Sequence, residues 1–582
     1  MAEITDAEPT EAGQSLKEIT FDAPGTAYLE GPVGAGSSHR RVILQPKPTS
    51  DPNDPLNWSF RRKSVHFAIA SFFTMLVFAL WVNFLFLHIL YCSNLFRIDI
   101  GPVVWQEFEE LLHITYPQLN NQYAVNCVSL GLGSIILVPL ALKFGRRPIY
   151  LLTAMVVLIT AIWQAVLRDL ANMMAAQVFN GIACAVGWTL VPITITDLFF
   201  VHQRGRANAV YQIMSSTGVF LAPVAAGYIA DAQGWPWIYW WSAILVAVNL
   251  VLFIFVFEET KFSIHTIAGS EIRAPTSAQE IGNISTGDVS KRTELVDPES
   301  QFTATTNPST GPHGIQNWID CSIPLKSPRQ RLALFTTSAG TLSQFLQHIY
   351  MPVQVLVSIP AVAYVMIQYS SALVWFTVVA TTQAEYLALP PYNFGTTGIG
   401  LLNLPPFIGS IFGCIWGGPV SDWSIKFLAR RNEGIYEPEM RLYISLLPGI
   451  LGPVGLFLYG YSVSEGLPWI FPCLGSGLYG FSMSALIPIA LTYLTDSYNK
   501  ILGTALIGVS FAQYMVATII IFALDPWISS MGLYNTFTVI GCLAVGCNLL
   551  CIPMILYGKK WRISCKAQYE KMAAVQFDER GI

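Results

Sequence analysis

Long apolar stretches separated by short polar segments dominate the chain from residue 65 onward. An α-helix needs roughly 20 predominantly apolar residues to cross the hydrocarbon core of a bilayer. The run from His66 to Phe96 is too long for one simple helix, so residues 83–98 are either an interfacial extension or a gene-prediction error. The pattern predicts twelve membrane-spanning helices, at residues 65–90, 123–142, 149–167, 173–193, 208–229, 237–257, 358–382, 399–418, 442–461, 469–493, 503–524 and 534–557.

The polar segments divide these spans into two groups of six. Residues 1–63 are polar and rich in Gly, Pro and Glu, which predicts a disordered cytoplasmic tail without a cleavable signal peptide. Residues 258–331 are rich in Ser, Thr, Asn and Pro and predict a disordered cytoplasmic linker. The remaining predicted parts are a first bundle at 64–257, a second bundle at 332–557 with an interfacial lead-in helix at 332–350, and a cytoplasmic tail at 558–582.

Composition supports an integral membrane protein. Of the 582 residues, 53% are hydrophobic and 12% are charged, whereas a soluble domain carries about 25% charged residues. The net charge of -4 gives no reason to expect a nucleic-acid partner. The 10 cysteines show neither a metal-ligand spacing nor a disulfide framework, so no metal and no cofactor is expected. The sequon at Asn283 would face the cytoplasm, so we expect no glycosylation.

Basic residues are distributed unequally between the loops, which predicts the orientation of the chain. Short cytoplasmic loops of membrane proteins carry an excess of Lys and Arg. With the N-terminus inside, both termini are cytoplasmic in a multi-pass protein, which we expect in the cell membrane. The cytoplasmic loops then contain Lys143, Arg146, Arg147, Arg204, Arg206, Lys426, Arg430, Arg431, Arg441 and Lys500, and the external loops contain Arg97 and Arg168.

One basic turn, Lys143–Pro148, lies between the second and third predicted spans. It combines a flexible Gly with three positive charges at the membrane surface. By itself such a turn is also typical of an ordinary stop-transfer loop. Its meaning therefore depends on the rest of the chain.

The two halves resemble each other at corresponding spans. Residues 190–196 (LVPITIT) match 486–492 (LIPIALT), and residues 138–142 match 418–422 at the ends of the second and eighth spans. Chance similarity between apolar helices is the alternative, but both matches fall at equivalent places, which favours duplication. Two six-helix repeats around a site at the bilayer midplane are a transporter architecture.

The chain resembles the major facilitator superfamily over residues 51–562. The resemblance is carried by the basic turn, by the corresponding residues Gly418 and Asp422 of the second half, and by the arrangement of six spans followed by six. This resemblance implies an all-α integral membrane fold with 12 transmembrane helices in two pseudo-symmetric six-helix bundles. Shorter segments are similar to the fungal twelve-span drug:proton antiporter group and its branch with the yeast histidinol and polyamine transporter. These segments are 54–58, 200–205, 258–261, 391–394 and 429–434.

The fifth span carries a version of the antiporter pattern of this superfamily, running from Gly218 to Gly227. Two of the usual glycines are replaced by Ala222 and Ala226. Small residues let helices approach closely, and Pro223 frees a backbone carbonyl and introduces a bend. An ordinary small-residue packing face is the alternative. The resemblance implies a bend that helps gating, and export rather than import.

Departures from the family pattern change the expected mechanism. Leu142 stands where the family usually has an acidic residue that latches the cytoplasmic side, so only Asp422 in the second half can form this latch. Gln177 replaces an Arg that is often tied to proton coupling. Asp197 and Asp422 are the coupling candidates, with a helix-end salt bridge as the alternative. The predicted gating or coupling residues are Gly145, Arg146, Arg147, Asp197, Gly218, Pro223, Gly227 and Asp422.

The predicted spans contain no ionisable residue at the centre. A polyamine cavity would need buried carboxylates, and Trp188 stands where branch relatives often have an acidic residue, which disfavours polyamines. Neutral amides and aromatic walls suit an uncharged or amphipathic organic molecule, although any single ring can instead face lipid. The predicted substrate-binding residues are Asn126, Asn180, Trp188, Tyr364, Gln368, Trp375, Gln383, Asn403 and Gln513.

These features together predict a monomeric secondary transporter that exports a small neutral or amphipathic compound, a drug or fungal secondary metabolite, in exchange for protons. The chain has no Gly-rich nucleotide-binding loop that would point to ATP. The alternatives are nutrient or polyamine uptake and a transporter-like nutrient sensor. A membrane enzyme would need His or paired carboxylates inside, and His88 has no acidic partner nearby in the sequence.

Overall fold

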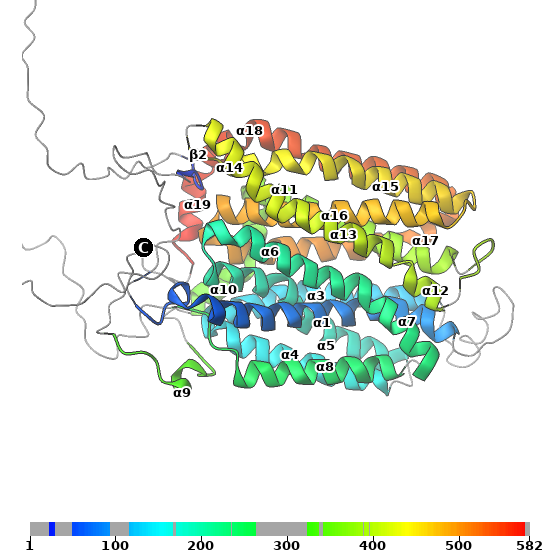
Figure 1. The fold of residues 1–582 in the computed structure, drawn as a ribbon, viewed down its shortest axis with the longest axis horizontal. Helices are drawn as coiled ribbons and strands as arrows, with labels where there is room; N and C mark the ends of the chain where they lie inside the picture. Colours follow the sequence, from blue (N-terminus) through cyan, green and yellow to red (C-terminus); the bar gives the residue numbers. More distant parts are fainter. Residues whose placement is uncertain are drawn as a thin grey trace, which may run out of the picture.

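The computed structural model describes residues 23–28, 49, 51–93, 116–166, 170–233, 236–262, 323–336, 342–387, 389–394, 396–432 and 434–576. Long helices run side by side along one axis, and a two-stranded sheet lies at one end of the bundle (Figure 1). We call this end the tail end, because it holds both Ala23 and Gln576, and the opposite end the far end.

The first half of the bundle follows a short 3-10 turn, η1 (Pro55–Asn57). Its helices are α1 (Phe60–Ser93), α3 (Tyr116–Phe144), α4 (Arg146–Ala165), α5 (Leu170–Leu198), α6 (Val201–Ser216), the π-helix η2 (Thr217–Leu221), α7 (Ala222–Gln233) and α8 (Pro236–Phe255).

The second half begins after the short helix α9 (Pro328–Arg331). Its elements are α10 (Leu342–Ser358), α11 (Pro360–Tyr386), α12 (Thr396–Leu401), α13 (Leu404–Ile415), the π-helix η4 (Trp416–Val420), α14 (Ser421–Arg431), η5 (Pro438–Ser445), α15 (Leu446–Ser464), α16 (Ile470–Ser497), η6 (Asn499–Ile501), α17 (Leu502–Leu549), α18 (Cys551–Ser564) and α19 (Lys566–Ala573).

The all-α membrane fold predicted from the sequence is confirmed. Among the described residues, ten helices are long and apolar enough to cross a membrane. One of them, Asn499–Ser564, contains the last two predicted spans, which are separated by Gly532 at a φ of 76°. The first predicted span lies in α1. Large apolar side chains such as Phe255 and Leu556 are exposed on the outer faces, as expected where lipid replaces water.

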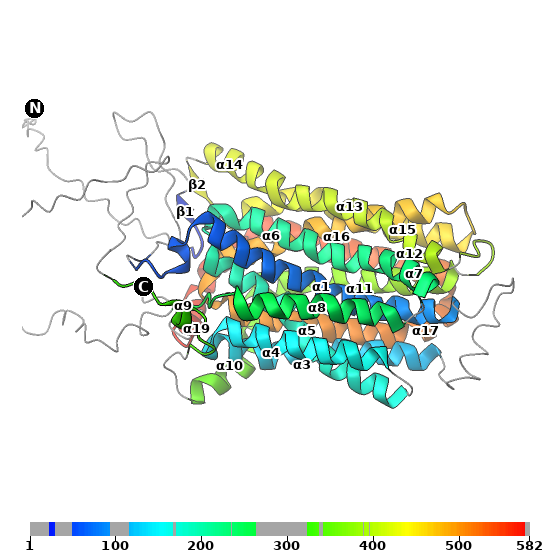
Figure 2. The ribbon, with the colours of Figure 1, turned by 60° about the horizontal axis from the view of Figure 1, so that its bottom comes forward.

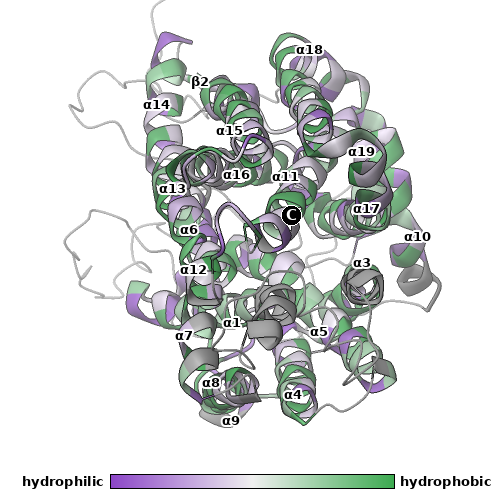
Figure 3. Ribbon diagram, turned by 90° about the vertical axis from the view of Figure 1, so that its right-hand side faces the viewer, coloured by the Kyte–Doolittle hydropathy of each residue, from purple (hydrophilic) through white to green (hydrophobic). Residues whose placement is uncertain are grey.

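The two halves meet along two seams, which lie on opposite sides of the bundle in the end-on view (Figure 3). In the first seam, α3 packs against α17. In the second seam, α6, η2 and α7 pack against α12, α13 and η4. Both π-helices belong to the second seam, so this seam contains the two irregular turns of the spans. Such turns often mark functional positions in helices.

The lead-in helix of the second half differs from its predicted position. Helix α10 begins at Leu342 rather than at residue 332, and it ends at Ser358, immediately before α11. It lies outside the first seam, beside α3 and α17 (Figures 2 and 3). Its outward face is apolar, with Tyr350, Val353 and Val357 half or more exposed.

Two pieces of the N-terminal segment that the sequence predicts to be disordered have defined contacts. Ala27 and Tyr28 form strand β1, which pairs antiparallel with β2 (Ile435–Tyr436) of the second half. Residues 51–58 pack at the start of α1, where the Asp54 side chain accepts a hydrogen bond from the Leu56 N–H (3.0 Å). Composition did not reveal the pairing of Ala27 and Tyr28, because their partners Tyr436 and Ile435 lie far away in the sequence.

Candidate functional site: a gate at the tail end

The first half carries an ion pair at the tail end. Arg146 is the first residue of α4 and is fully buried. Its Nε donates to Asp197 Oδ2 at the end of α5 (3.2 Å). The two predicted gating residues are therefore brought together, and they tie the start of the third span to the end of the fourth.

Glu259, which follows α8, holds the turn between α3 and α4. Its carboxylate accepts hydrogen bonds from the backbone N–H groups of Arg146 (2.9 Å) and Arg147 (3.1 Å). An anion at a helix start satisfies free N–H groups and interacts favourably with the helix dipole. Gly145 has a φ of 107° and lies against Glu259, where a Cβ atom would overlap the carboxylate. Lys261 donates to the carbonyl of Leu142 at the end of α3.

The second half repeats the ion pair and extends it. Arg441 in η5 donates from Nε to Asp496 Oδ2 at the end of α16 (2.8 Å). It also donates from Nη1 to Asp422 Oδ1 in α14 (3.2 Å). Tyr436 donates its hydroxyl proton to the same Asp496 oxygen (2.5 Å). Burial raises the pKa of the Tyr436 phenol well above its usual value, so the phenol stays a donor at physiological pH.

A second charged contact lies beside this network and differs in kind from the contact of Glu259 in the first half. There, Glu259 after the sixth span accepts from backbone N–H groups at the start of the third span. Here, Glu439 at the start of the ninth span is the acid, and Arg562 after the twelfth span is the base. Arg562 Nε and Nη2 donate to the two Glu439 oxygens (2.8 and 2.6 Å), and both residues are buried.

The Asp422 carboxylate also contacts the opposite half. It lies against the backbone of Gly205 near the start of α6, so closely that a Cβ atom at Gly205 would overlap it. The equivalent position in the first half, Leu142, lies against Gly503 near the start of α17 (Leu142 Cδ1 at 3.4 Å from a Cβ placed on Gly503). The two halves thus meet at a carboxylate in one seam and at a leucine in the other.

The antiporter-like segment of the fifth span begins in the π-helix η2, which ends two residues before Pro223, and continues in α7. Gly218 lies so close to α1 that a Cβ atom would overlap the carbonyl of Met75. Near the far end, the Pro223 carbonyl is 3.1 Å from a Cβ placed on Gly400 of α12. Gly227 lies in α7. The halves are therefore in contact at both ends of the second seam.

Near the middle of the bundle, aromatic rings meet between the halves. Trp188 of α5 contacts Phe78 of α1 (ring centroids 4.7 Å apart) and Tyr369 of α11 (6.4 Å). Phe220 of η2 contacts Phe376 of α11 (5.5 Å). All five rings are buried. Of the predicted substrate-binding residues, Trp188 is the one for which a side-chain contact across the halves is described.

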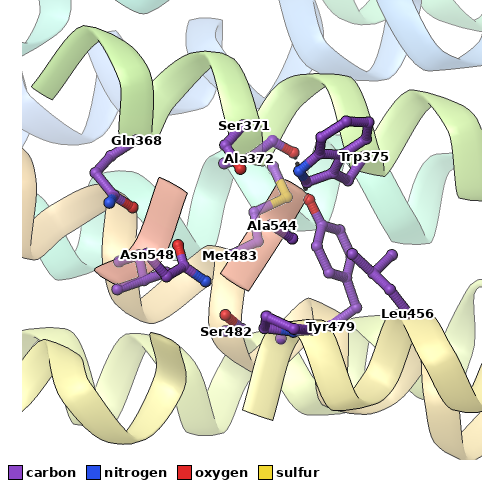
Figure 4. A pocket seen from close by; sticks show the side chains of 13 residues that line it. Gln368, Ser371, Ala372, Trp375, Leu456, Tyr479, Ser482, Met483, Ala544 and Asn548 are labelled. Carbon is purple, nitrogen blue, oxygen red and sulfur yellow. Dashed lines mark hydrogen bonds between the residues drawn. The ribbon is translucent and has the colours of Figure 1, made fainter. Parts of the chain in front are cut away.

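Three of the four predicted residues of the seventh span face the interior of the second half instead. Gln368 and Trp375 line a small cavity of about 20 Å³ between α11, α15, α16 and α17 (Figure 4). Gln368 donates to the Cys547 carbonyl (2.9 Å), and Tyr364 contacts Tyr493. A cavity of this size holds a water molecule or two rather than an organic substrate.

Three of the other predicted amides have described partners within their own half. Asn126 donates to the Gln177 side chain (2.7 Å), so a neutral amide pair occupies the place where the family usually has an Arg. Asn180 accepts from Thr160 (3.3 Å), and Asn403 donates to the carbonyl of Ile399 (3.2 Å). Gln383 and Gln513 are buried in α11 and α17.

Two features of the site were not predicted. Tyr369 and Phe376 form the face of the seventh span that meets the first half, and their spacing of seven residues would have marked this face. The partnership of Glu259 with the basic turn joins residues more than 110 positions apart, and no local pattern predicts it. Among the described residues, no group of three His, Cys, Asp or Glu side chains could hold a metal ion.

Comparison with known proteins identifies the fold. The Major Facilitator Superfamily model matches residues 67–522. The chain is 30% identical to an uncharacterized MFS-type transporter of Schizosaccharomyces pombe, over 91% of this chain and 89% of that protein. It is 28% identical to Protein HOL1 of Saccharomyces cerevisiae (94% and 96% covered) and 26% identical to efflux pump radE of Floropilus chiversii (88% and 83% covered).

Solved structures show the same fold at low sequence identity. The human organic anion transporter MFSD10 matches with a TM-score of 0.54 and 14% identity, over 84% of this chain and 99% of that one. A partially occluded inward-open form of the xylose transporter XylE from E. coli matches with a TM-score of 0.53 and 13% identity, over 84% and 97%. The family match over residues 67–522 and the 30% identity to a relative along most of both chains show that this chain is a secondary transporter, not an enzyme, and that it belongs to the major facilitator superfamily.

Proposed function

We propose that the protein exports a small neutral or amphipathic organic compound in exchange for protons, by alternating access. The observation that carries this proposal is the aromatic contact between the halves at Trp188 and Tyr369. A substrate that binds between the halves would separate these rings and pack between them. Aromatic walls with few polar groups favour uncharged or amphipathic ligands.

The tail end serves as the cytoplasmic gate in this proposal, with both termini in the cytoplasm and the protein in the cell membrane. The two latches, Leu142 against Gly503 and Asp422 against Gly205, join the halves at this end. Substrate loading from the cytoplasm requires both to separate. The ion pairs Arg146–Asp197 and Arg441–Asp496 remain within their own halves and keep each half rigid during this movement.

Glu385 is the residue we propose for proton exchange. It lies near the far end of α11, two residues beyond the apolar span Pro360–Gln383. Burial and the neighbouring Asp525 raise the pKa of the Glu385 carboxyl to about 7. A carboxyl with this pKa is protonated in an acidic exterior and releases its proton near neutral pH, as proton coupling requires.

Export is proposed because the fifth span combines a π-helix with Pro223 in an antiporter-like segment, and because one similar protein is named an efflux pump. Polyamine uptake is the competing function. It is less favoured because the described contacts of Trp188 are with aromatic rings, and an aromatic wall does not replace the hydration of several positive charges.

Transport into inside-out membrane vesicles from cells that express the chain tests the proposal. An inside-acid pH gradient should drive uptake of a neutral amphipathic probe, cycloheximide, and should not drive uptake of spermidine. Trp188→Ala should weaken cycloheximide transport about tenfold, since losing a buried ring costs more than 1.4 kcal/mol. Glu385→Gln should remove the pH dependence near 7. Spermidine transport without cycloheximide transport would overturn the substrate class, and uptake indifferent to the gradient would overturn proton coupling.

A further inference from the structure

A short piece of the N-terminal segment, Ala23–Tyr28, is docked on the tail end of the second half, next to the charged latch. Its strand β1 pairs with β2, in the register Ala27 with Tyr436 and Tyr28 with Ile435 (Figure 2). Strand β2 belongs to the loop between the eighth and ninth spans. The docked piece therefore adds a strand to a loop of the gate, using backbone hydrogen bonds.

The fit of this piece requires glycine at its centre. Gly25 has a φ of 83°, a left-handed conformation that side chains disfavour. A Cβ atom at Gly25 would lie 2.5 Å from the Asp496 carbonyl oxygen and 2.9 Å from Ser497 Cα, closer than packing allows. Ala23 is also buried. The end of α16 and the N-terminal piece are thus shaped to each other.

The buried Arg562 fixes the piece from the other side. Its Nη1 donates to the carbonyl of Pro24 and to Thr26 Oγ1 (3.3 Å). The remaining guanidinium nitrogens are held by Glu439. Glu439 therefore holds the Arg562 guanidinium in the orientation that binds the N-terminal piece. For this reason the arginine loses little conformational freedom when the piece docks.

The docked piece reaches the latch through a continuous set of contacts. It pairs with the backbone of Tyr436, whose hydroxyl binds Asp496. Asp496 binds Arg441, and Arg441 binds Asp422, which lies against Gly205 of the opposite half. Every step in this series is a described contact between neighbours.

We propose that Ala23–Tyr28 is a strap that holds the gate closed, by ordering the loop that carries Tyr436 and so fixing Asp422 against α6. The strap is reversible because β1 and β2 pair over two residues only. Release of the strap loosens the latch and favours the state that is open at the tail end. This inference rests on the proposed alternating-access gate and is independent of the substrate.

Hydrogen–deuterium exchange of the full-length protein in lipid nanodiscs tests the strap without any substrate. The test variant is Gly25→Val, which cannot adopt the docked geometry. The matched control is Gly546→Val in α17, where nothing lies within 4 Å of an added Cβ. Wild type should protect the amides of residues 27–28 and 435–436. Gly25→Val should raise exchange about tenfold or more at 23–28, at 435–441 and in α6 of the opposite half.

Three results would overturn the strap. The first is free exchange of residues 23–28 in the wild type. The second is faster exchange of these residues in Gly25→Val with no change in α6, which would show docking without coupling to the latch. The third is an equal change in Gly546→Val. A loss of cycloheximide transport with the exchange pattern intact would instead count against the proposed substrate alone, so the two failures are distinguishable.

Discussion

The two seams between the halves occupy equivalent positions, but they are held by different chemistry. In the first seam, Leu142 lies against Gly503 near the start of α17. In the second, Asp422 lies against Gly205 near the start of α6 and is also bound to Arg441. The repeat in the sequence makes Leu142 and Asp422 counterparts, so the two halves differ at the contact that joins them.

This difference means that the two seams do not resist opening equally. A leucine contact is apolar and gains about 25 cal/mol for each Å² buried. A carboxylate near a helix start gains roughly 0.3–1 kcal/mol, and up to about 2 kcal/mol when partly buried. Asp422 is in addition fixed by a buried guanidinium. We therefore expect the second seam to control opening and the first to follow.

Removal of Arg441 should have the largest effect. Arg441→Ala leaves Asp422 and Asp496 without their shared cation, and breaking a buried ion pair costs about 3–5 kcal/mol. The yield of monodisperse protein in detergent should fall severely. The control is Lys559→Ala, which removes the partly exposed pair with Glu437 and should cost at most about 1 kcal/mol. Equal losses in both variants would show that the network does not stabilise the second half.

Alanine substitutions at Gly205 and Gly503 should distinguish the contributions of the two seams to opening. At Gly205 the added Cβ meets a carboxylate that is fixed by Arg441, whereas at Gly503 it meets the flexible end of Leu142 at 3.4 Å. Gly205→Ala should reduce the initial transport rate about tenfold or more, and Gly503→Ala should change it less than about twofold. The readout is the vesicle assay, normalised to protein amount. A larger loss of transport in Gly503→Ala than in Gly205→Ala would show that the first seam controls opening.

Moving the carboxylate from the second seam to the first should have the smallest effect, but it compares the two seams most directly. Asp422→Asn should slow transport, because the neutral amide loses its charge-assisted bond to Arg441. The additional change Leu142→Asp places a carboxylate in the first seam, against Gly503, and should raise the transport rate of the Asp422→Asn variant about threefold. Leu142→Ala in the same background is the control. Restoration by alanine as well would show that space, rather than charge, was gained.

Sequence reasoning succeeded where the evidence was periodic or repeated. Apolar length predicted the spans, and the duplicated segments together with the family resemblance predicted that Asp422 lacks an acidic counterpart at Leu142. Arg146 and Asp197 were named separately as gating or coupling residues; the structure brings them together, and their role stays a prediction. The spans follow from local composition, whereas the named residues also depended on the family resemblance.

The seventh span shows why the rest was not predictable. Gln368 and Tyr369 are adjacent in sequence and lie about 100° apart around the helix. Gln368 faces the interior of the second half, and Tyr369 faces the first half. Because α11 is buried on both sides, polarity does not distinguish these faces. The partners of Glu259 and of Ala23–Tyr28 are distant in sequence, so local patterns could not predict them either.

The peripheral contacts of the tail end differ in kind between the halves. Glu439 joins Arg562 through two charged side chains that are both buried, whereas Glu259 accepts from backbone N–H groups at the start of α4. Any residue other than proline supplies a backbone N–H, so the contact of Glu259 does not depend on which side chains follow Gly145. Positions 439 and 562 depend on each other, because replacing one of these residues leaves the other as an unpaired buried charge. Substitutions at positions 439 and 562 are therefore expected to be tolerated only in pairs.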